Sequence, residues 1–250
     1  MKDNPTFVLV HGSWHDGGSW SAVGGNLRDA GFPVVVPTLP GHGLDVDRVK
    51  VTHDDYVQEV VRSFESVDAP VVLVGHSFGG SVISRVAELH PERCRLLIYY
   101  SAFVPRDGEC VADSLPEPFI AFLEDAATSS ADRSVILPNE LFDGAFANTA
   151  DPATAAVLYG TLVPEPSGPV FEPLRLPSFD RLGIASAYIS CLRDRALPPG
   201  SFHPGQSSRL CNPQLLEIDA DHEALLTAPE RLAWALLKAA GADELRLAAA

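Results

Sequence analysis

The sequence predicts an α/β fold in which a mostly parallel central sheet is covered by helices on both faces. Short apolar runs alternate along the chain with amphipathic segments, the pattern of strands joined by crossover helices. Several of these runs show no polar alternation, which indicates strands that are buried on both faces. With 250 residues, of which 46% are hydrophobic and 20% charged, the chain can bury the core of one domain.

Six short runs, most of them β-branched, are expected to form the strands of this sheet. Runs of this kind, bounded by turn residues, are typical of buried strands. The predicted strands are Phe7–Val10, Val34–Val36, Val71–Val74, Leu96–Tyr100, Ala187–Leu192 and Leu215–Ile218.

Four segments between or after these runs carry apolar residues at three- and four-residue spacing, which predicts amphipathic helices. Gly31 follows the first segment and Pro229 opens the last, as expected for helix ends. The predicted helices are Trp20–Ala30, Tyr56–Phe64, Phe78–Leu89 and Pro229–Ala240.

The section from Val104 to Asp180 breaks this rhythm, because strand signals vanish there and 10 of the 21 prolines fall in it. We interpret residues 1–250 as one domain with residues 104–180 inserted as a helical cap. Pro118–Ala127 and Pro152–Tyr159 are expected to be short helices, and Pro164–Pro169 a loop. A disordered linker is the alternative, but nine residues give the section apolar faces to bury: Phe119, Phe122, Leu123, Leu141, Phe142, Phe146, Leu158, Tyr159 and Leu162.

Composition excludes several classes of function. The formal charge of -15 provides no positive field for nucleic acid, and no apolar run approaches the roughly 18–20 residues of a membrane span. No secretory leader pattern opens the chain, so we expect a cytoplasmic protein. The cysteines form no close pairs, which predicts reduced thiols, no metal site and no disulfide framework: Cys94, Cys110, Cys191 and Cys211. We expect no cofactor, because Gly17-Gly18 belongs to no nucleotide-binding motif.

A G-x-S-x-G motif, residues 75–79, lies between the predicted strand Val71–Val74 and a helical pattern. A serine on a sharp strand-to-helix turn needs residues without side chains two positions before and after it, since the strand and helix would otherwise collide. The motif therefore predicts Ser77 as a nucleophile. An ordinary glycine turn with a capping serine is the alternative.

A serine hydroxyl needs a base, and His222 is the best placed of eight histidines because it follows the last predicted strand, at the carboxyl edge of the sheet. The other histidines have plainer positions in turns, loops or helix ends: His11, His15, His42, His53, His76, His90 and His203.

The base in turn needs a carboxylate to orient it, and Asp194 follows the strand Ala187–Leu192 at the same edge. The order serine, aspartate, histidine suits a strand-turn-helix nucleophile. Asp219 and Asp221 are rivals by sequence proximity, and Asp194 could instead pair with a neighbouring arginine.

Two backbone donors are required to stabilise a developing oxyanion. We expect one to be the N–H of Phe78 and the other to be the N–H of Ser13, in the loop after the first strand, where Gly12 allows a sharp turn.

The motifs together resemble the α/β-hydrolase superfamily over nearly the whole chain. They are most similar to the branch of plant methyl esterases and hydroxynitrile lyases and its bacterial relatives. The resemblance rests on residues 7–15, 34–43 and 74–80, on Asp194-x-Ala-Leu-Pro and on Asp221-His222. It implies that Ser77, Asp194 and His222 form a catalytic triad, that the N–H groups of Ser13 and Phe78 form the oxyanion hole, and that residues 104–180 line the pocket.

Two departures argue against cyanohydrin cleavage. Plant lyases of this branch have a threonine after the first histidine and a lysine after the catalytic histidine, where this chain has Gly12 and Glu223. Glu223 cannot stabilise a cyanide anion, so the resemblance implies hydrolysis.

We therefore expect a carboxylic ester hydrolase that cleaves an ester, thioester or lactone of small to medium hydrophobic substrates through an acyl-enzyme. A homodimer is left open. An acyltransferase or cyclase using the same triad is an alternative, as is a non-catalytic ligand-binding receptor. Beyond the triad and the oxyanion donors, the candidate pocket residues are Gly12, Trp14, His15, His76, Phe119, Phe122, Phe142, Phe146 and Leu162.

Overall fold

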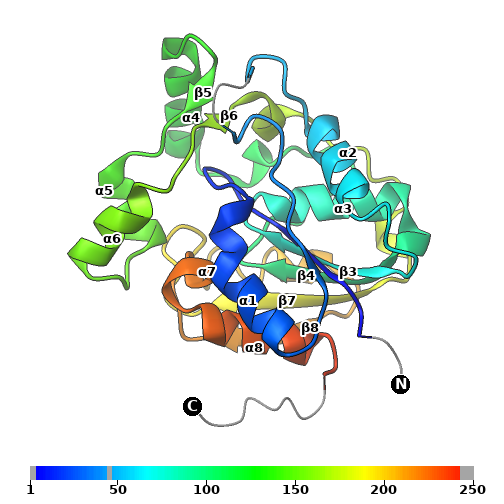
Figure 1. Ribbon diagram of the computed structural model, residues 1–250. Coiled ribbons are helices and arrows are strands. Elements are labelled where there is room, and N and C mark those ends of the chain that lie inside the picture. The colour runs from blue at the N-terminus through cyan, green and yellow to red at the C-terminus, as the bar shows by residue number, and fades with distance from the viewer. Residues whose placement is uncertain (1–3, 44–46, 243–250) are drawn as a thin grey trace.

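A parallel six-stranded sheet forms the centre of the computed structural model, which describes residues 4–43 and 47–242 (Figure 1). Its strand order is β2-β1-β3-β4-β7-β8, and every neighbouring pair is parallel. The strands are β1 Phe7–Val10, β2 Val34–Val35, β3 Val71–His76, β4 Cys94–Tyr100, β7 Ala185–Cys191 and β8 Gln214–Ile218. The predicted fold class is confirmed, and all six predicted strands are present with small changes at their ends.

Alternate side chains of the central strands pack on opposite faces of the sheet. In β1, Val8 and Val10 join one core cluster while Phe7 and Leu9 join the other. All four are fully buried, because a parallel sheet of this kind has helices on both sides. The absence of polar alternation in the sequence has this cause.

Two pairs of longer helices cover the sheet. Helices α2 (His53–Ser63) and α3 (Gly79–Leu89) pack on the face of Val8 and Val10, whereas α1 (Ser21–Asp29) and α8 (Pro229–Ala239) cover the other face, together with the short α7 (Ala224–Thr227). Helix α2 begins three residues earlier than predicted. Thr52 and Asp55 form a capping box there, which satisfies N–H groups at the helix start.

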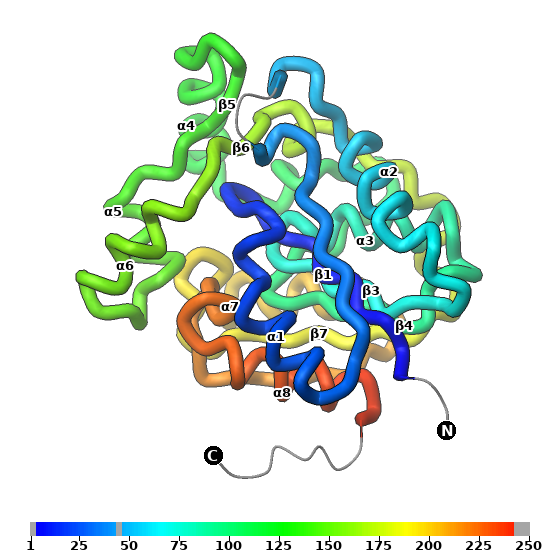
Figure 2. The backbone as a smooth tube through the Cα atoms, viewed as in Figure 1, coloured from blue at the N-terminus to red at the C-terminus, as the bar shows by residue number. Residues whose placement is uncertain are grey.

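The residues between β4 and β7 add no strand to the main sheet. They form α4 (Glu117–Ser129), α5 (Asn139–Leu141), α6 (Pro152–Tyr159) and a separate two-stranded sheet of β5 (Ser134–Val135) and β6 (Glu165–Pro166). Figure 2 shows these elements, in green to lime, grouped outside the main sheet and its covering helices. Buried side chains of the segment, such as Leu123 and Phe146, share one core cluster with β1 and β3.

The expectation of a strand-free section with a loop at Pro164–Pro169 is wrong. Glu165–Pro166 pairs antiparallel with Ser134–Val135, and a 3-10 helix follows at Gly168–Phe171. A proline fits a strand that has a free edge, because there its missing N–H leaves no bond unmade. No described helix is both long and apolar enough to cross a membrane.

Candidate active site

Ser77 lies in the turn between β3 and α3 with a φ of +49°, in the left-handed region. Such a conformation costs about 1–3 kcal/mol for a residue with a side chain, so its surroundings must hold it. The Ser77 N–H donates to the Tyr100 carbonyl (3.2 Å), and the Phe103 N–H donates to the Ser77 carbonyl (3.1 Å). The end of β4 and the chain after it thus fix this turn.

The glycines of the motif permit the close approach of strand and helix. A Cβ atom at Gly75 would lie 2.6 Å from the Gly79 carbonyl oxygen, and one at Gly79 would lie 2.8 Å from the His11 carbonyl oxygen. Real Cβ atoms do not come this close to backbone. The two glycines therefore prevent a collision between strand and helix, as the motif predicts.

His222 and Asp194 form a buried pair beside this turn. His222 Nδ1 lies 2.8 Å from Asp194 Oδ2, and each side chain is 1% exposed. Asp194 Oδ1 accepts the Leu197 N–H (2.8 Å), and the Tyr100 hydroxyl donates to the His222 carbonyl (2.5 Å). The Leu197 contact therefore holds the carboxylate and the Tyr100 contact holds the backbone of His222. Among the described residues no hydrogen bond occupies the second ring nitrogen of His222, Nε2, which leaves it for a reacting group.

The pair shifts the pKa of both its members. Burial disfavours the imidazolium form of His222, but the Asp194 carboxylate, assisted by Glu223, outweighs it and raises the His222 pKa above its usual 6.5. Burial likewise disfavours ionised Asp194, but His222 and the Leu197 N–H together lower the Asp194 pKa. Asp194 is thus a carboxylate that favours a proton on His222, as a base requires.

The rival carboxylates are occupied elsewhere. Asp219 forms an exposed ion pair with Arg193 (2.5 and 2.8 Å). Asp221 Oδ2 accepts both the N–H (3.0 Å) and the hydroxyl (2.6 Å) of Thr149. Arg193 therefore pairs with Asp219 and leaves Asp194 to His222.

The other histidines have contacts of their own. Burial, reinforced by His222, lowers the pKa of His76 well below 6.5, and its ring stacks on Tyr100 with centroids 4.6 Å apart. Burial also lowers the pKa of His53 to about 4. His11 accepts the Leu39 N–H, His15 and His42 contact glutamates, His203 stacks on Tyr188, and His90 caps the end of α3.

The two proposed oxyanion donors lie beside the nucleophile. Ser13 follows β1 and Phe78 follows Ser77, and both line the same cavity as Ser77 and His222. Within the described residues neither of their backbone N–H groups donates to a protein acceptor. A Cβ at Gly12 would lie 2.8 Å from Ser77 Cβ, so only glycine lets this loop approach the turn so closely.

The cavity has a volume of about 440 Å³, within the usual range for small-molecule sites. Apolar side chains from the main domain and from residues 104–180 form most of its wall. Asp113, Glu165 and Arg195 are the charged residues among the described lining positions.

Three of the predicted pocket residues, Trp14, Phe119 and Phe146, line this cavity, and Phe146 packs edge-on against the His222 ring (centroids 5.2 Å apart). The other six do not line it. Each is used in packing or pairing behind the wall: Gly12 against Ser77, His15 against Glu223, His76 against Tyr100, Phe122 against Phe119, Phe142 against Tyr159, and Leu162 against the core beneath the segment.

Two buried glutamates were not predicted. Glu223 Oε2 lies 3.0 Å from His15 Nε2, and this pair raises the His15 pKa against the effect of burial. Glu165 is 2% exposed and belongs to the cavity wall. Neither has a local signal in the sequence, because the partner of each is far along the chain. No cluster of three or more metal-binding side chains occurs among the described residues.

The family profile described as "Alpha/beta hydrolase family" matches residues 7–236. Among solved structures, a Paenibacillus protein is 38% identical with a TM-score of 0.89, covering 94% of this chain and 98% of that one. It is described as an extracellular alpha/beta-hydrolase with structural and functional homology to tobacco salicylic acid binding protein 2.

Two curated relatives extend this comparison. Salicylic acid-binding protein 2 of Nicotiana tabacum is 29% identical, over 96% of this chain and 98% of its own length. A carbendazim hydrolyzing esterase of a Nocardioides species is 39% identical over 114 residues, which are 44% of this chain and 47% of that protein.

Proposed function

The chain belongs to the alpha/beta hydrolase family, and on that premise we propose that it is a carboxylic ester hydrolase with Ser77 as nucleophile. One observation carries the proposal. A strained serine and a histidine border one apolar cavity: Ser77 and His222 both line it, and His222 is paired behind the wall with the buried Asp194. An esterase among the curated relatives supports the reaction class.

The first half of the proposed reaction forms an acyl-enzyme. Ser77 Oγ attacks the carbonyl carbon of the ester while His222 Nε2 takes the hydroxyl proton. The negative charge on the carbonyl oxygen is held by the N–H groups of Ser13 and Phe78. The bond to the leaving oxygen then breaks, and His222 returns the proton to the departing alcohol.

The second half releases the acid. A water molecule attacks the acyl carbon, and His222 accepts one of its protons. The bond to Ser77 Oγ breaks, His222 gives the proton back to the serine, and the carboxylic acid leaves. If an alcohol or amine of a substrate replaced water, the same steps would give acyl transfer or cyclisation, and product analysis with and without an added nucleophile separates these outcomes.

The cavity supports a substrate of small to medium size with a hydrophobic acyl or alcohol part. Its wall is mainly apolar, and residues 104–180, which supply Phe119, Phe146 and Glu165 to it, act as the proposed cap. Because those residues form so much of the wall, they determine which ester fits.

The cellular location is proposed from the cysteines. The four described thiols, Cys94, Cys110, Cys191 and Cys211, are unpaired, which supports a reducing, cytoplasmic setting. The Paenibacillus relative is described as extracellular. Fractionation of the native host decides the point, since activity in the culture medium would contradict a cytoplasmic enzyme.

The direct test uses the wild type and Ser77→Ala with a chromogenic ester and an organophosphonate. We expect the variant to fold, to lose turnover and to escape labelling. Retention of label on another residue would contradict the assignment, and ligand binding by the wild type without turnover would favour a receptor.

A further inference from the structure

Trp14, the residue after the proposed oxyanion donor Ser13, has an unusual backbone. Its φ is +62°, a conformation that is unfavourable for a bulky side chain, and the residue is buried. The loop that contains it must therefore be held in place by contacts from elsewhere.

Three hydrogen bonds hold Trp14, and the partner in each belongs to residues 104–180. The Trp14 N–H donates to Glu165 Oε2 (2.9 Å), the Trp14 carbonyl accepts the Val163 N–H (2.9 Å), and the indole N–H donates to the Val135 carbonyl (3.0 Å). Val135 and Glu165 are paired residues of β5 and β6. Both strands of this small sheet therefore form hydrogen bonds with the loop after β1.

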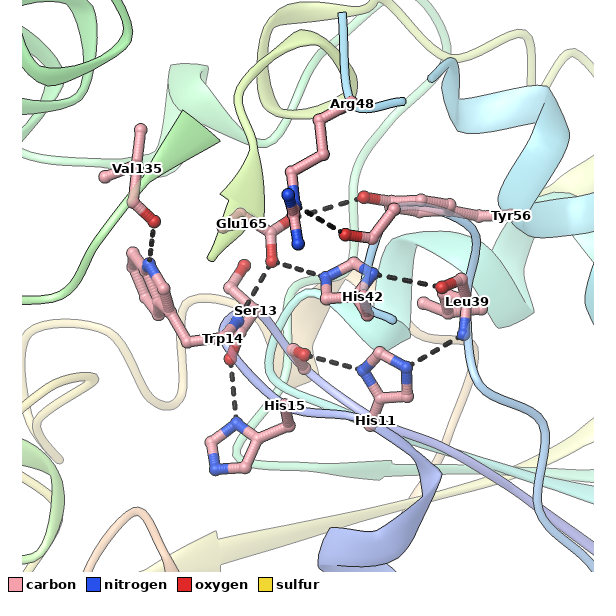
Figure 3. A network of polar contacts seen from close by, with 12 residues as sticks. His11, Ser13, Trp14, His15, Leu39, His42, Arg48, Tyr56, Val135 and Glu165 are labelled. Carbon is pink, nitrogen blue, oxygen red and sulfur yellow. Dashed lines mark hydrogen bonds and ion pairs between the residues drawn. The ribbon is translucent and has the colours of Figure 1, made fainter. Parts of the chain in front are cut away.

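Glu165 is the centre of the network in Figure 3. Besides Trp14, its Oε2 contacts His42 Nε2 at 2.7 Å, and the Tyr56 hydroxyl donates to Oε1 over a longer 3.4 Å. His42 Nδ1 in turn lies 3.3 Å from the Leu39 carbonyl oxygen. A buried carboxylate is tolerated only with such partners, and these partners fix the position of Oε2.

The peptide unit between Ser13 and Trp14 is held at both ends. Glu165 accepts its N–H, and the His15 ring contacts its carbonyl oxygen (Nδ1 to O, 2.8 Å). On the other side of Ser13, Gly12 is packed against Ser77. The backbone of Ser13 is thus confined between two fixed points, and Ser13 itself lines the cavity.

We propose that Glu165 is a positioning residue, which holds the loop after β1 so that the Ser13 N–H points to the developing oxyanion. The cap is then a part of the oxyanion hole as well as a cover for substrate. This inference rests on the proposed esterase function. It concerns the transition state, because the oxyanion exists there and not in the bound ester.

A substrate-binding role is the competing possibility, because Glu165 lines the cavity and the contact of Oε1 with Tyr56 is long. In that role the carboxylate would accept a hydrogen bond from a hydroxyl or N–H of the substrate. Its loss would raise KM for esters that carry a donor and leave kcat for donor-free esters unchanged.

The test compares Glu165→Leu, which removes both acceptor oxygens, with Glu165→Gln, which keeps one. Glu172→Leu is the matched control, because Glu172 belongs to the same segment and accepts a backbone N–H as well, that of His53 (3.0 Å). Each variant is assayed for kcat and KM with a donor-free ester. Its inhibition constants are measured with a trifluoromethyl ketone, which forms a tetrahedral oxyanion on serine, and with the corresponding unreactive amide.

We expect Glu165→Leu to lower kcat by about 10- to 100-fold, somewhat less than the direct loss of an oxyanion donor. Affinity for the trifluoromethyl ketone should fall by the same factor, while KM and amide affinity stay within about threefold. Glu165→Gln should show a smaller loss of kcat, again matched by the loss of affinity for the trifluoromethyl ketone. This variant provides the test if the leucine variant fails to fold. Glu172→Leu should match the wild type.

Two results would overturn the inference: an unchanged kcat in both Glu165 variants, or a change confined to KM and amide affinity. Equal losses in Glu172→Leu would also overturn it by indicating a general effect of the segment. A wild type that neither turns over ester nor is labelled would contradict the proposed function itself, which keeps the two failures distinct.

Discussion

His222 is the residue whose protonation controls the first proposed step, because only the neutral ring can accept the Ser77 proton. Asp194 raises its pKa above 6.5 despite burial. More of the ring is therefore protonated, and inactive as a base, near neutral pH than in a free histidine. We expect kcat/KM to increase with pH through a pKa above 6.5, measured on the free enzyme with a neutral ester.

Asp194→Asn should shift the acidic limb of this pH profile, the pH range in which kcat/KM increases, to lower pH. Asp194 is the strongest of the groups that raise the His222 pKa, ahead of Glu223, and burial opposes them. Its loss therefore lowers the His222 pKa, so the activity that is left persists to lower pH. We expect kcat to fall by about 10⁴-fold, as the same change does in another serine hydrolase. An acidic limb that stays in place in the variant would contradict the pairing of Asp194 with His222.

At this scale the sequence predicted residues whose chemistry has a local pattern. Ser77 lies in a five-residue motif, and His222 and Asp194 each follow a predicted strand. Glu165 and Glu223 were missed because their partners, His42 and His15, are 123 and 208 positions away in the chain. Only the folded structure brings them together.

At the scale of elements, the turn from β3 to α3 requires glycine at positions 75 and 79, where a side chain would collide with the backbone. In Gly75→Ala the new Cβ would lie 2.6 Å from the Gly79 carbonyl oxygen, so the strand or the helix must shift. We expect a loss of about 1–3 kcal/mol in unfolding free energy, measured by urea denaturation, and at least a tenfold fall in kcat/KM because Ser77 moves.

Gly25→Ala in α1 is the matched control. A Cβ there meets nothing within 4 Å, and alanine in a helix interior is favoured over glycine by about 0.5–1 kcal/mol. Unchanged activity and slightly higher stability are expected. If Gly75→Ala behaved like this control, the steric argument for the turn would be wrong.

The apolar runs predicted every strand of the main sheet, including the two-residue β2, but not the two strands of the small sheet. Strands β5 and β6 have two residues each, too few for any alternation to be visible, and Pro166 favoured a loop. The start of α2 was also missed, although the capping box at Thr52 and Asp55 is a signal that the sequence does contain.

At the scale of the whole molecule, the composition of the central strands made the fold predictable, since β1 and β3 are buried and apolar on both faces. Which residues of the segment 104–180 line the cavity was harder to predict from the sequence. Which apolar side chains line a cavity and which pack behind it depends on helix orientation, and Phe142 and Phe146, on the same turn, take these two different roles.

The net charge of -15 makes a prediction about substrates. The charged residues of the cavity do not make it positive, since it contains two acidic residues, Asp113 and Glu165, and one basic residue, Arg195. Hydrolysis of an ester with an anionic group should therefore speed up about two- to fivefold as ionic strength increases from about 0.01 M to about 0.15 M, because salt screens the repulsion. Steady-state rates for a matched neutral ester should stay constant. A slower reaction of the anionic ester in salt would indicate that Arg195 attracts it.

The most direct test of the central claim is mass spectrometry of the intact protein after reaction with a fluorophosphonate, followed by peptide mapping. We expect a single adduct on Ser77 in the wild type and none in Ser77→Ala, with ester turnover lost in parallel. An adduct on another residue, or full turnover by Ser77→Ala, would contradict the assignment of Ser77 as the nucleophile.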